Sequence, residues 1–106
     1  MANRADLDRE LRTLLGSNNV YFQPPESTKL KFDCFVYRLS GANVVSADND
    51  IYLYNREYAL TFITKNPDNP LIDEIPKYFA KKLKICRLNS YFTSDNLNHY
   101  NYTISY

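Results

Sequence analysis

The sequence predicts an α+β domain in which two helices pack on a mostly antiparallel sheet. The expected element order is α-β-β-β-α-β-β, with a protruding hairpin between the second and third strands. Three observations lead to this expectation: a helical repeat of leucines near the N-terminus, strict alternation of side-chain types at the C-terminus, and a central strand too long for a small core. The length of 106 residues fits a single domain, residues 1–106.

Residues 4–15 are expected to form an amphipathic helix. Four leucines recur at i, i+4, i+7 and i+8, and so share one helical face: Leu7, Leu11, Leu14 and Leu15. Asn3 is a suitable N-cap, and Gly16 directly follows as a residue that can end the helix in the left-handed conformation.

The chain after this helix is expected to be extended. Residues 20–22 form a short apolar stretch that either pairs briefly with the sheet or covers its edge. Two prolines make residues 23–28 a connector, because proline lacks the N–H that a helix or a central strand requires. Residues 30–40 are expected to be the first strand, covered on both faces, with a turn at residues 40–43. Residues 44–47 then begin the second strand.

Residues 51–65 are expected to form the third strand. In its second half Tyr58, Leu60 and Phe62 share one face, and Ala59, Thr61 and Ile63 share the other. At about 3.3 Å per residue such a strand would span roughly 50 Å, which exceeds what a small core can cover. Part of the 44–56 hairpin, folded back at residues 48–50, is therefore expected to protrude.

A second helix is expected over residues 71–83, after the polar and proline-rich stop at residues 66–70. Its apolar residues recur near helical spacing: Leu71, Ile72, Ile75, Phe79 and Leu83. Pro76 leaves two possibilities open. Either the main helix begins at Pro76, where the missing N–H is harmless, or a first turn precedes it.

Two further strands are expected over residues 85–94 and 98–106, joined by a turn at residues 94–96. The last strand alternates strictly, which predicts one wet and one buried face. His99, Asn101, Thr103 and Ser105 belong to the wet face. Tyr100, Tyr102, Ile104 and Tyr106 belong to the buried face.

Composition argues against several classes of protein. The net charge of +1 disfavours a strongly basic nucleic-acid binder or a membrane-surface protein. No stretch approaches the roughly 20 apolar residues of a membrane span, and the first sixteen residues lack the apolar segment of a signal peptide. Cys34 and Cys86 are expected to be reduced, half-buried thiols. Ten tyrosines and six phenylalanines suit half-buried strands and protein interfaces.

The sequence offers no credible active site. His99, the single histidine, has no local Ser or Cys partner, and Asp33 would point away from Cys34 across the strand. Residues 48–50 resemble the start of a calcium loop but lack its later glycine and glutamate. We therefore expect no enzyme, no metal and no cofactor.

Several phrases of the chain resemble the tail-terminator or tail-completion proteins of long-tailed bacteriophages. The resemblance covers residues 18–106. It depends on "NVYFQPP", on "YNREYALTFITKNPDNP", on the short Ile-Pro helix that follows, and on the terminal "YFTSDNLNHYNYTISY". The second helix departs from the expected pattern, because Pro67, Pro70 and Pro76 crowd its beginning.

This resemblance implies a structural virion protein that forms a ring, usually a hexamer, at the head-proximal end of the tail tube. Such a ring ends tube polymerisation and joins the tail to the neck. The implied partners are other copies of the chain, the tail tube protein and a head-completion or neck protein. DNA would pass through the lumen without being read. Assembly would take place in the host cytoplasm, without a membrane partner.

A closed ring requires two different complementary patches on each copy. The 44–56 hairpin and the N-terminal helix with its connector, residues 16–28, are the expected patches. The candidate interface residues are Tyr21, Phe22, Val44, Tyr52, Tyr54 and Arg56. Two alternative functions stay open: another neck or head-completion subunit, or a small nucleic-acid-binding sheet on which Tyr100 and Tyr102 would stack bases.

Overall fold

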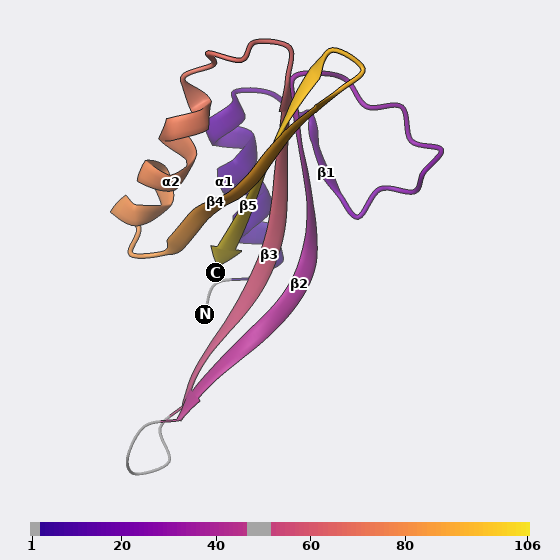
Figure 1. The fold of residues 1–106 in the computed structure, drawn as a ribbon. Helices are drawn as coiled ribbons and strands as arrows, with labels where there is room; N and C mark the ends of the chain where they lie inside the picture. Colours follow the sequence, from indigo (N-terminus) through magenta and orange to yellow (C-terminus); the bar gives the residue numbers. More distant parts are fainter. Residues whose placement is uncertain (1–2, 47–51) are drawn as a thin grey trace.

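The computed structural model describes residues 3–46 and 52–106 and confirms the α+β class. The helices lie beside a sheet from which a long hairpin extends (Figure 1). The elements in chain order are α1 (Arg4–Leu15), β1 (Val20–Phe22), β2 (Cys34–Ser46), β3 (Tyr52–Thr64), α2 (Leu71–Lys81), β4 (Ile85–Ser94) and β5 (Leu97–Ser105).

The five strands form one mixed sheet in the order β1-β2-β3-β5-β4. Only β1 pairs in parallel, with β2, and the other three pairings are antiparallel. Both helices pack on the same face, and their apolar residues meet the inward-facing residues of β2, β3 and β5. The opposite face of the sheet carries no helix of the described chain.

Helix α1 follows the sequence prediction closely. Asn3 accepts a hydrogen bond from the Asp6 backbone N–H at 3.0 Å, and the Asp6 carboxylate accepts one from the Asn3 N–H in return. This capping box satisfies donors that would otherwise lack partners. Gly16 ends the helix with φ +77°, and its N–H donates to the Arg12 carbonyl at 2.9 Å.

The expected turn at residues 40–43 is wrong, because β2 runs without interruption from Cys34 to Ser46. The register with β3 shifts between Leu39 and Gly41, so the segment holds a β-bulge, and the Ser40 hydroxyl donates to the Glu57 carbonyl at 3.1 Å. The strands expected at 30–40 and 44–47 are thus one strand that begins at Cys34. The first of the three strands before α2 is instead Val20–Phe22. Of the two alternatives for this stretch, pairing with the sheet is therefore the correct one.

Burial on β2 also departs from the expectation. Cys34 is fully buried rather than half-buried, whereas Leu39, expected to be covered, is 45% exposed. Cys86 is intermediate, and both thiols are free. The expected turn at residues 48–50 lies outside the described residues.

Helix α2 begins at Leu71, so the first turn does precede Pro76. Proline in a helix interior leaves the carbonyl four residues earlier without its usual donor. Here that carbonyl belongs to Ile72, and the Tyr102 hydroxyl of β5 donates to it at 2.8 Å. A residue from the sheet thus replaces the hydrogen bond that Pro76 cannot make.

The expected extension of α2 to Leu83 is wrong. The helix ends at Lys81, and Leu83 lies beyond it with φ +60° and an exposure of 94%. The Leu83 N–H donates to the Ala80 carbonyl and the Lys84 N–H to the Phe79 carbonyl, which is the Schellman arrangement. Leu83 therefore ends the helix instead of extending its apolar face.

The last two strands agree with the sequence. Burial alternates along β5 as expected, with Tyr100, Tyr102 and Ile104 buried and His99, Asn101 and Thr103 partly exposed between them. Asp95 and Asn96 form the turn, with φ of +54° and +64°. Two successive positive φ values suit the tight hairpin turns that match the twist of paired strands.

Candidate interaction surfaces

The hairpin formed by β2 and β3 extends well beyond the rest of the sheet (Figure 1). The pairing of β3 with β5 ends at Glu57 opposite Ser105, but the pairing with β2 continues for five more residue pairs, from Ala42 opposite Arg56 to Ser46 opposite Tyr52. We call these residues, 42–46 and 52–56, the arm. At about 3.3 Å per residue the arm is roughly 16 Å long. The predicted protrusion is therefore present in the described backbone.

Four of the six predicted interface residues belong to the arm. Val44 lies directly opposite Tyr54, and Tyr52 lies opposite Ser46. Arg56 stands where the arm leaves the body; it is exposed, and its carbonyl accepts a hydrogen bond from the Tyr106 N–H at 2.8 Å. The pairing thus brings these four positions together on one ribbon.

The other two predicted interface residues, Tyr21 and Phe22, lie on β1, away from the arm. Tyr21 is opposite Val36 in the parallel pairing, about six residues along β2 from the beginning of the arm. Phe22 packs on the core, with its ring centroid 5.0 Å from that of Tyr37 and the Arg4 guanidinium 4.5 Å above it. Part of Phe22 is thus already used within the subunit, and the six residues do not form one patch.

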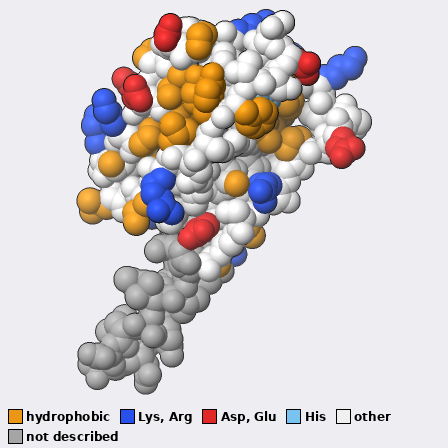
Figure 2. Space-filling model, viewed as in Figure 1, with side chains coloured by type: hydrophobic (Ala, Val, Ile, Leu, Met, Phe, Trp, Pro, Cys, Tyr) orange, Lys and Arg blue, Asp and Glu red, His pale blue; other side chains and the backbone are white. Residues whose placement is uncertain are grey.

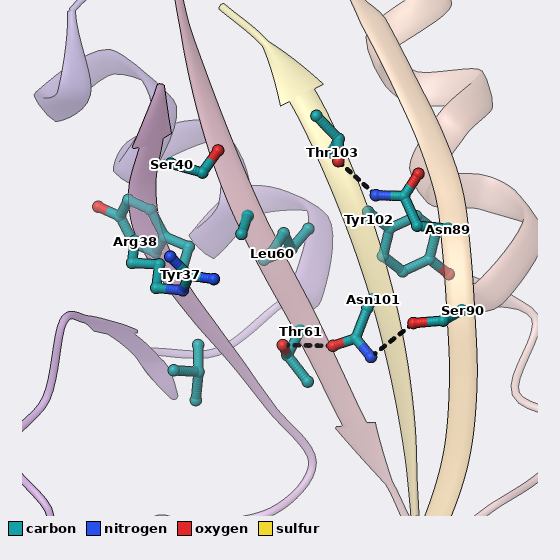
Figure 3. Close-up of a pocket in the computed structure, with 12 residues that line it drawn as sticks. Tyr37, Arg38, Ser40, Leu60, Thr61, Asn89, Ser90, Asn101, Tyr102 and Thr103 are labelled. Carbon is teal, nitrogen blue, oxygen red and sulfur yellow. Dashed lines mark hydrogen bonds between the residues drawn. The ribbon is translucent and has the colours of Figure 1, made fainter. Parts of the chain in front are cut away.

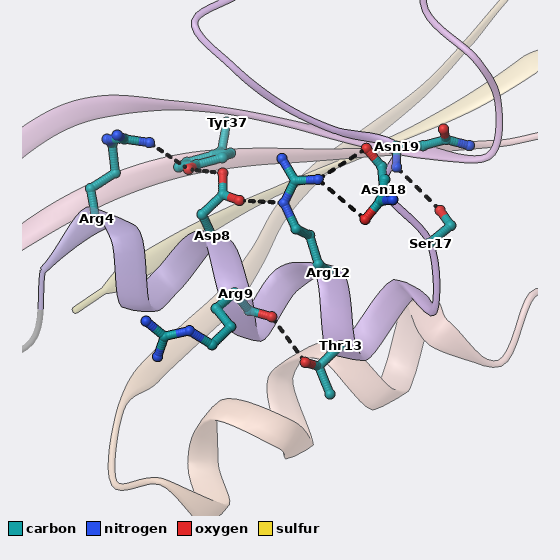
Figure 4. A network of polar contacts seen from close by, with 9 residues as sticks. All are labelled: Arg4, Asp8, Arg9, Arg12, Thr13, Ser17, Asn18, Asn19 and Tyr37. Carbon is teal, nitrogen blue, oxygen red and sulfur yellow. Dashed lines mark hydrogen bonds and ion pairs between the residues drawn. The ribbon is translucent and has the colours of Figure 1, made fainter.

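Helix α1 is fixed to β2 by a polar network (Figure 4). The buried Tyr37 donates its hydroxyl proton to the Asp8 carboxylate at 2.6 Å, and Arg4 donates to the same hydroxyl at 3.4 Å. Arg12 Nε donates to the other Asp8 oxygen at 2.5 Å. Burial raises the pKa of Asp8, but the hydrogen bonds from Tyr37 and Arg12 and the nearby guanidinium charges lower it further, so its pKa lies below the ordinary value.

A second set of polar contacts joins the two helices and the C-terminal residue. Glu10 of α1 accepts a hydrogen bond from the Tyr106 hydroxyl and pairs with the Lys82 ammonium group at 3.0 Å. Because α1 uses its apolar face in the core and several of its charged groups in these contacts, its role is largely to hold the subunit together.

The helix-free face of the sheet contains a shallow hollow of about 390 Å³ (Figure 3). Its floor is a row of polar side chains that bond to one another across three strands. The Thr61 hydroxyl donates to Asn101 at 2.8 Å, Asn101 donates to Ser90 at 3.0 Å, and Asn89 donates to Thr103. Arg38 supplies the one charged side chain among the residues lining the hollow. This surface can accept and donate hydrogen bonds.

Among the described residues that line the hollow, no nucleophilic side chain lies beside a His, Asp or Glu that could act as its base. His99 lies on the same face, but its ring stacks on Phe92 with centroids 4.4 Å apart, and burial lowers its pKa against the opposing effect of Asp95. Burial and the charge of Asp33 raise the pKa of Cys34 to about 12, which disfavours the reactive thiolate. Within residues 3–46 and 52–106 no three His, Cys, Asp or Glu side chains gather as a metal site would require. None of the described helices is both long and apolar enough to span a membrane.

The proposed base-stacking role of Tyr100 and Tyr102 is wrong. Their side chains lie on the helix-covered face, with exposures of 7% and 1%. Their hydroxyl groups donate to the Pro67 and Ile72 carbonyls, at 3.3 and 2.8 Å. A base stacked on either ring would have to displace the helix layer.

Sequence reasoning missed one surface, the outer edge of β4. Among the residues whose burial is described, five of the seven exposed large apolar side chains lie on this strand or just before it: Leu83, Ile85, Leu88, Tyr91 and Phe92. In Figure 2, which is viewed as in Figure 1, apolar side chains gather on the face of the body turned toward the viewer. No local pattern could indicate this exposure, because it results from the place of β4 at the end of the strand order.

A scan against models of known protein families finds no match, and a search of curated proteins finds no similar sequence.

Proposed function

We propose that this protein is a structural subunit of a bacteriophage tail that assembles into a ring at the head-proximal end of the tail tube. The ring stops polymerisation of the tube and joins the tail to the neck, with DNA passing through its lumen. Its partners are other copies of the chain, the tail tube protein and a neck or head-completion protein. It acts as a non-enzymatic component of the virion after assembly in the host cytoplasm.

The arm is the observation that carries this proposal. A two-stranded hairpin alone in water is marginally stable, because it has no third strand or helix to cover it. The arm extends five residue pairs beyond β5, the neighbouring strand of the body. A small domain that keeps such a ribbon has a use for it as a contact with another chain. The rest of the described surface is consistent with a structural role, since it has a polar hollow and a long apolar edge but no catalytic arrangement.

The test is a shortened arm. Replacing residues 44–54 by Asn-Gly joins Asn43 to Asn55, which are paired opposite each other, through a two-residue turn that suits a hairpin. We expect the variant to fold, by circular dichroism, and to lose the rings that the wild-type protein forms in negative-stain images and light scattering. A matched control is Lys77→Ala, on the exposed side of α2, which should leave the rings unchanged.

Tail length gives a second readout. Particles assembled without the subunit should carry tails of uncontrolled length, and particles supplied with the arm-shortened variant should share that defect. A protein that is strictly monomeric and shifts an oligonucleotide at physiological salt would contradict the proposal. So would normal tail lengths in particles that lack the subunit.

A further inference from the structure

Strand β4 is the last strand of the sheet and presents a free edge. It is ten residues long, it pairs with β5 on one side, and no described strand pairs with it on the other. Nine of its residues are exposed, with Cys86 as the exception. A strand edge offers unpaired N–H and C=O groups, to which another strand can add.

The exposed apolar side chains of β4 favour association at this edge. Ile85, Leu88, Tyr91 and Phe92 are 64%, 47%, 55% and 49% exposed, whereas Arg87 is the one charged residue on the strand. Proteins usually protect long edges with lysines, prolines or short strands. Here the protection consists of Arg87 and a bulge between Leu88 and Ser90. Such an edge fits a protein partner that contributes a strand.

The same chain carries the arm, whose two strands pair with each other, and no described strand adds to the outer edge of either. Beyond the hydrogen bond from Tyr106 to the Arg56 carbonyl, no described strand pairs with the β3 side of the arm. The arm and the β4 edge lie at different places on the subunit, because β5 separates β3 from β4 in the strand order and the arm extends past the end of β5. Ten residues of β4 offer enough length for the five residue positions of an arm strand.

We infer that the β4 edge of one copy receives the arm of the neighbouring copy, by backbone pairing and burial of the apolar side chains of β4. This inference rests on the proposed ring and names the two patches that close it. Head-to-tail contacts need two different surfaces on each subunit, which the arm and the edge supply. A symmetric pairing of β4 with β4 of a second copy would cover both edges but leave both arms uncovered in water.

The first test places charges on the β4 edge, and circular dichroism checks that the variants fold, because Tyr91 stacks on the core residue Tyr100 with ring centroids 5.0 Å apart. The double variant Leu88→Lys/Tyr91→Lys places two charges on the exposed edge, and we expect its self-association to weaken by on the order of tenfold or more. The milder Leu88→Thr keeps a good strand residue and should weaken association less, which guards against a folding defect. Leu83→Lys is the matched control: it charges a leucine that is even more exposed, 94% against 47% for Leu88, but lies outside the strand, and it should assemble as the wild type does.

The second test mixes two variants. At a concentration at which the wild type assembles but the weakened contact does not form, the double edge variant and the arm-shortened variant should each be monomeric in light scattering, because each has lost one half of every contact. Their mixture should form one-to-one dimers that grow no further, since one intact arm meets one intact edge. Dimers of the arm-shortened variant alone would reveal symmetric β4 pairing and would overturn the inference.

The outcomes separate the inference from the function on which it depends. Rings that persist in the double edge variant overturn the inference and leave the proposed ring intact. A wild-type protein that stays monomeric at the highest soluble concentration also overturns the inference, and tail lengths then decide the function separately.

Discussion

At the scale of single residues, one tyrosine hydroxyl fixes the position of the N-terminal helix on the sheet. Tyr37 donates to Asp8, and its ring lies in the core between Phe22 and Tyr58. Burial, the hydrogen bond to Asp8 and that carboxylate's charge raise the pKa of Tyr37 to about 12, against the opposing effect of Arg4. The hydroxyl thus stays protonated and can donate throughout the neutral range.

Replacing Tyr37 by Phe is expected to lower the free energy of unfolding at neutral pH by about 1–2 kcal/mol, because the Asp8 carboxylate loses a donor. The folded-state pKa of Asp8 is depressed below the ordinary value of 3.8, so its stabilising effect is present above that value and is lost as pH falls through the folded-state pKa. The difference between wild type and variant should therefore shrink as the pH falls below about 4.

Urea unfolding at a series of pH values measures this effect. Tyr21→Phe is a suitable control, since the Tyr21 hydroxyl accepts from the Lys31 N–H and has no carboxylate partner in the described contacts. The change in the free energy of unfolding caused by Tyr21→Phe should be the same at every pH. A Tyr37→Phe difference that is constant from pH 7 to pH 3 would show that Asp8 gains nothing from the hydroxyl.

At the scale of elements, the two helices differ in how they end and in the regularity of their interior. Helix α1 is followed by Gly16, which adopts a positive φ at little cost, whereas the positive φ after α2 belongs to Leu83, a residue with a side chain. Helix α2 also carries Pro76 in its interior, and Tyr102 of β5 bonds the carbonyl that the proline leaves free. The α2 helix thus depends on the sheet for its own regularity.

A double-mutant cycle tests this dependence. Tyr102→Phe should cost about 1–2 kcal/mol of stability in the wild-type chain, because it leaves the Ile72 carbonyl without a donor in a partly buried place. In the Pro76→Ala background the loss should be smaller by about 1 kcal/mol, since the N–H at position 76 can then donate to Ile72. Chemical denaturation of the four proteins measures the coupling. Additive effects would mean that the tyrosine hydroxyl does not compensate for the proline.

At the scale of the whole molecule, the body and the arm have separate sources of stability. Among the residues whose burial is described, 3–42 and 56–106, the core residues lie on α1, α2 and the strands of the body, together with Tyr106. The molecule measures 52 × 28 × 23 Å, so it is much longer than the body alone requires. In the proposed ring, the arm would be stabilised by its contact with a neighbouring copy.

This division predicts how stability depends on concentration. The midpoint of thermal unfolding of the wild-type protein should rise with protein concentration, because association stabilises the folded state by mass action. The midpoint of the arm-shortened variant should be independent of concentration and close to that of the dilute wild type. Scanning calorimetry over a hundredfold range of concentration provides the measurement. A variant that is already unstable when dilute would show that the arm supports the body.

The sequence by itself determined the elements whose signals are local. The leucine repeat with Asn3 and Gly16 defined α1, the strict alternation defined β5, and Asp95 and Asn96 placed the turn between the last two strands. The length of the third strand predicted the protrusion of the hairpin. These features depend on residues a few positions apart, so their periodicity and turn chemistry are visible without any knowledge of partners.

Tertiary structure alone decided the features that depend on distant residues. The segment around Ser40 is a bulge and not a turn because β3 continues opposite it. Pro76 is tolerated inside α2 because Tyr102 stands across from it. The apolar residues of β4 are exposed because β5 inserts between β3 and β4 and leaves β4 at the edge. Each outcome is set by pairing with chain that is remote in sequence, which no local pattern encodes.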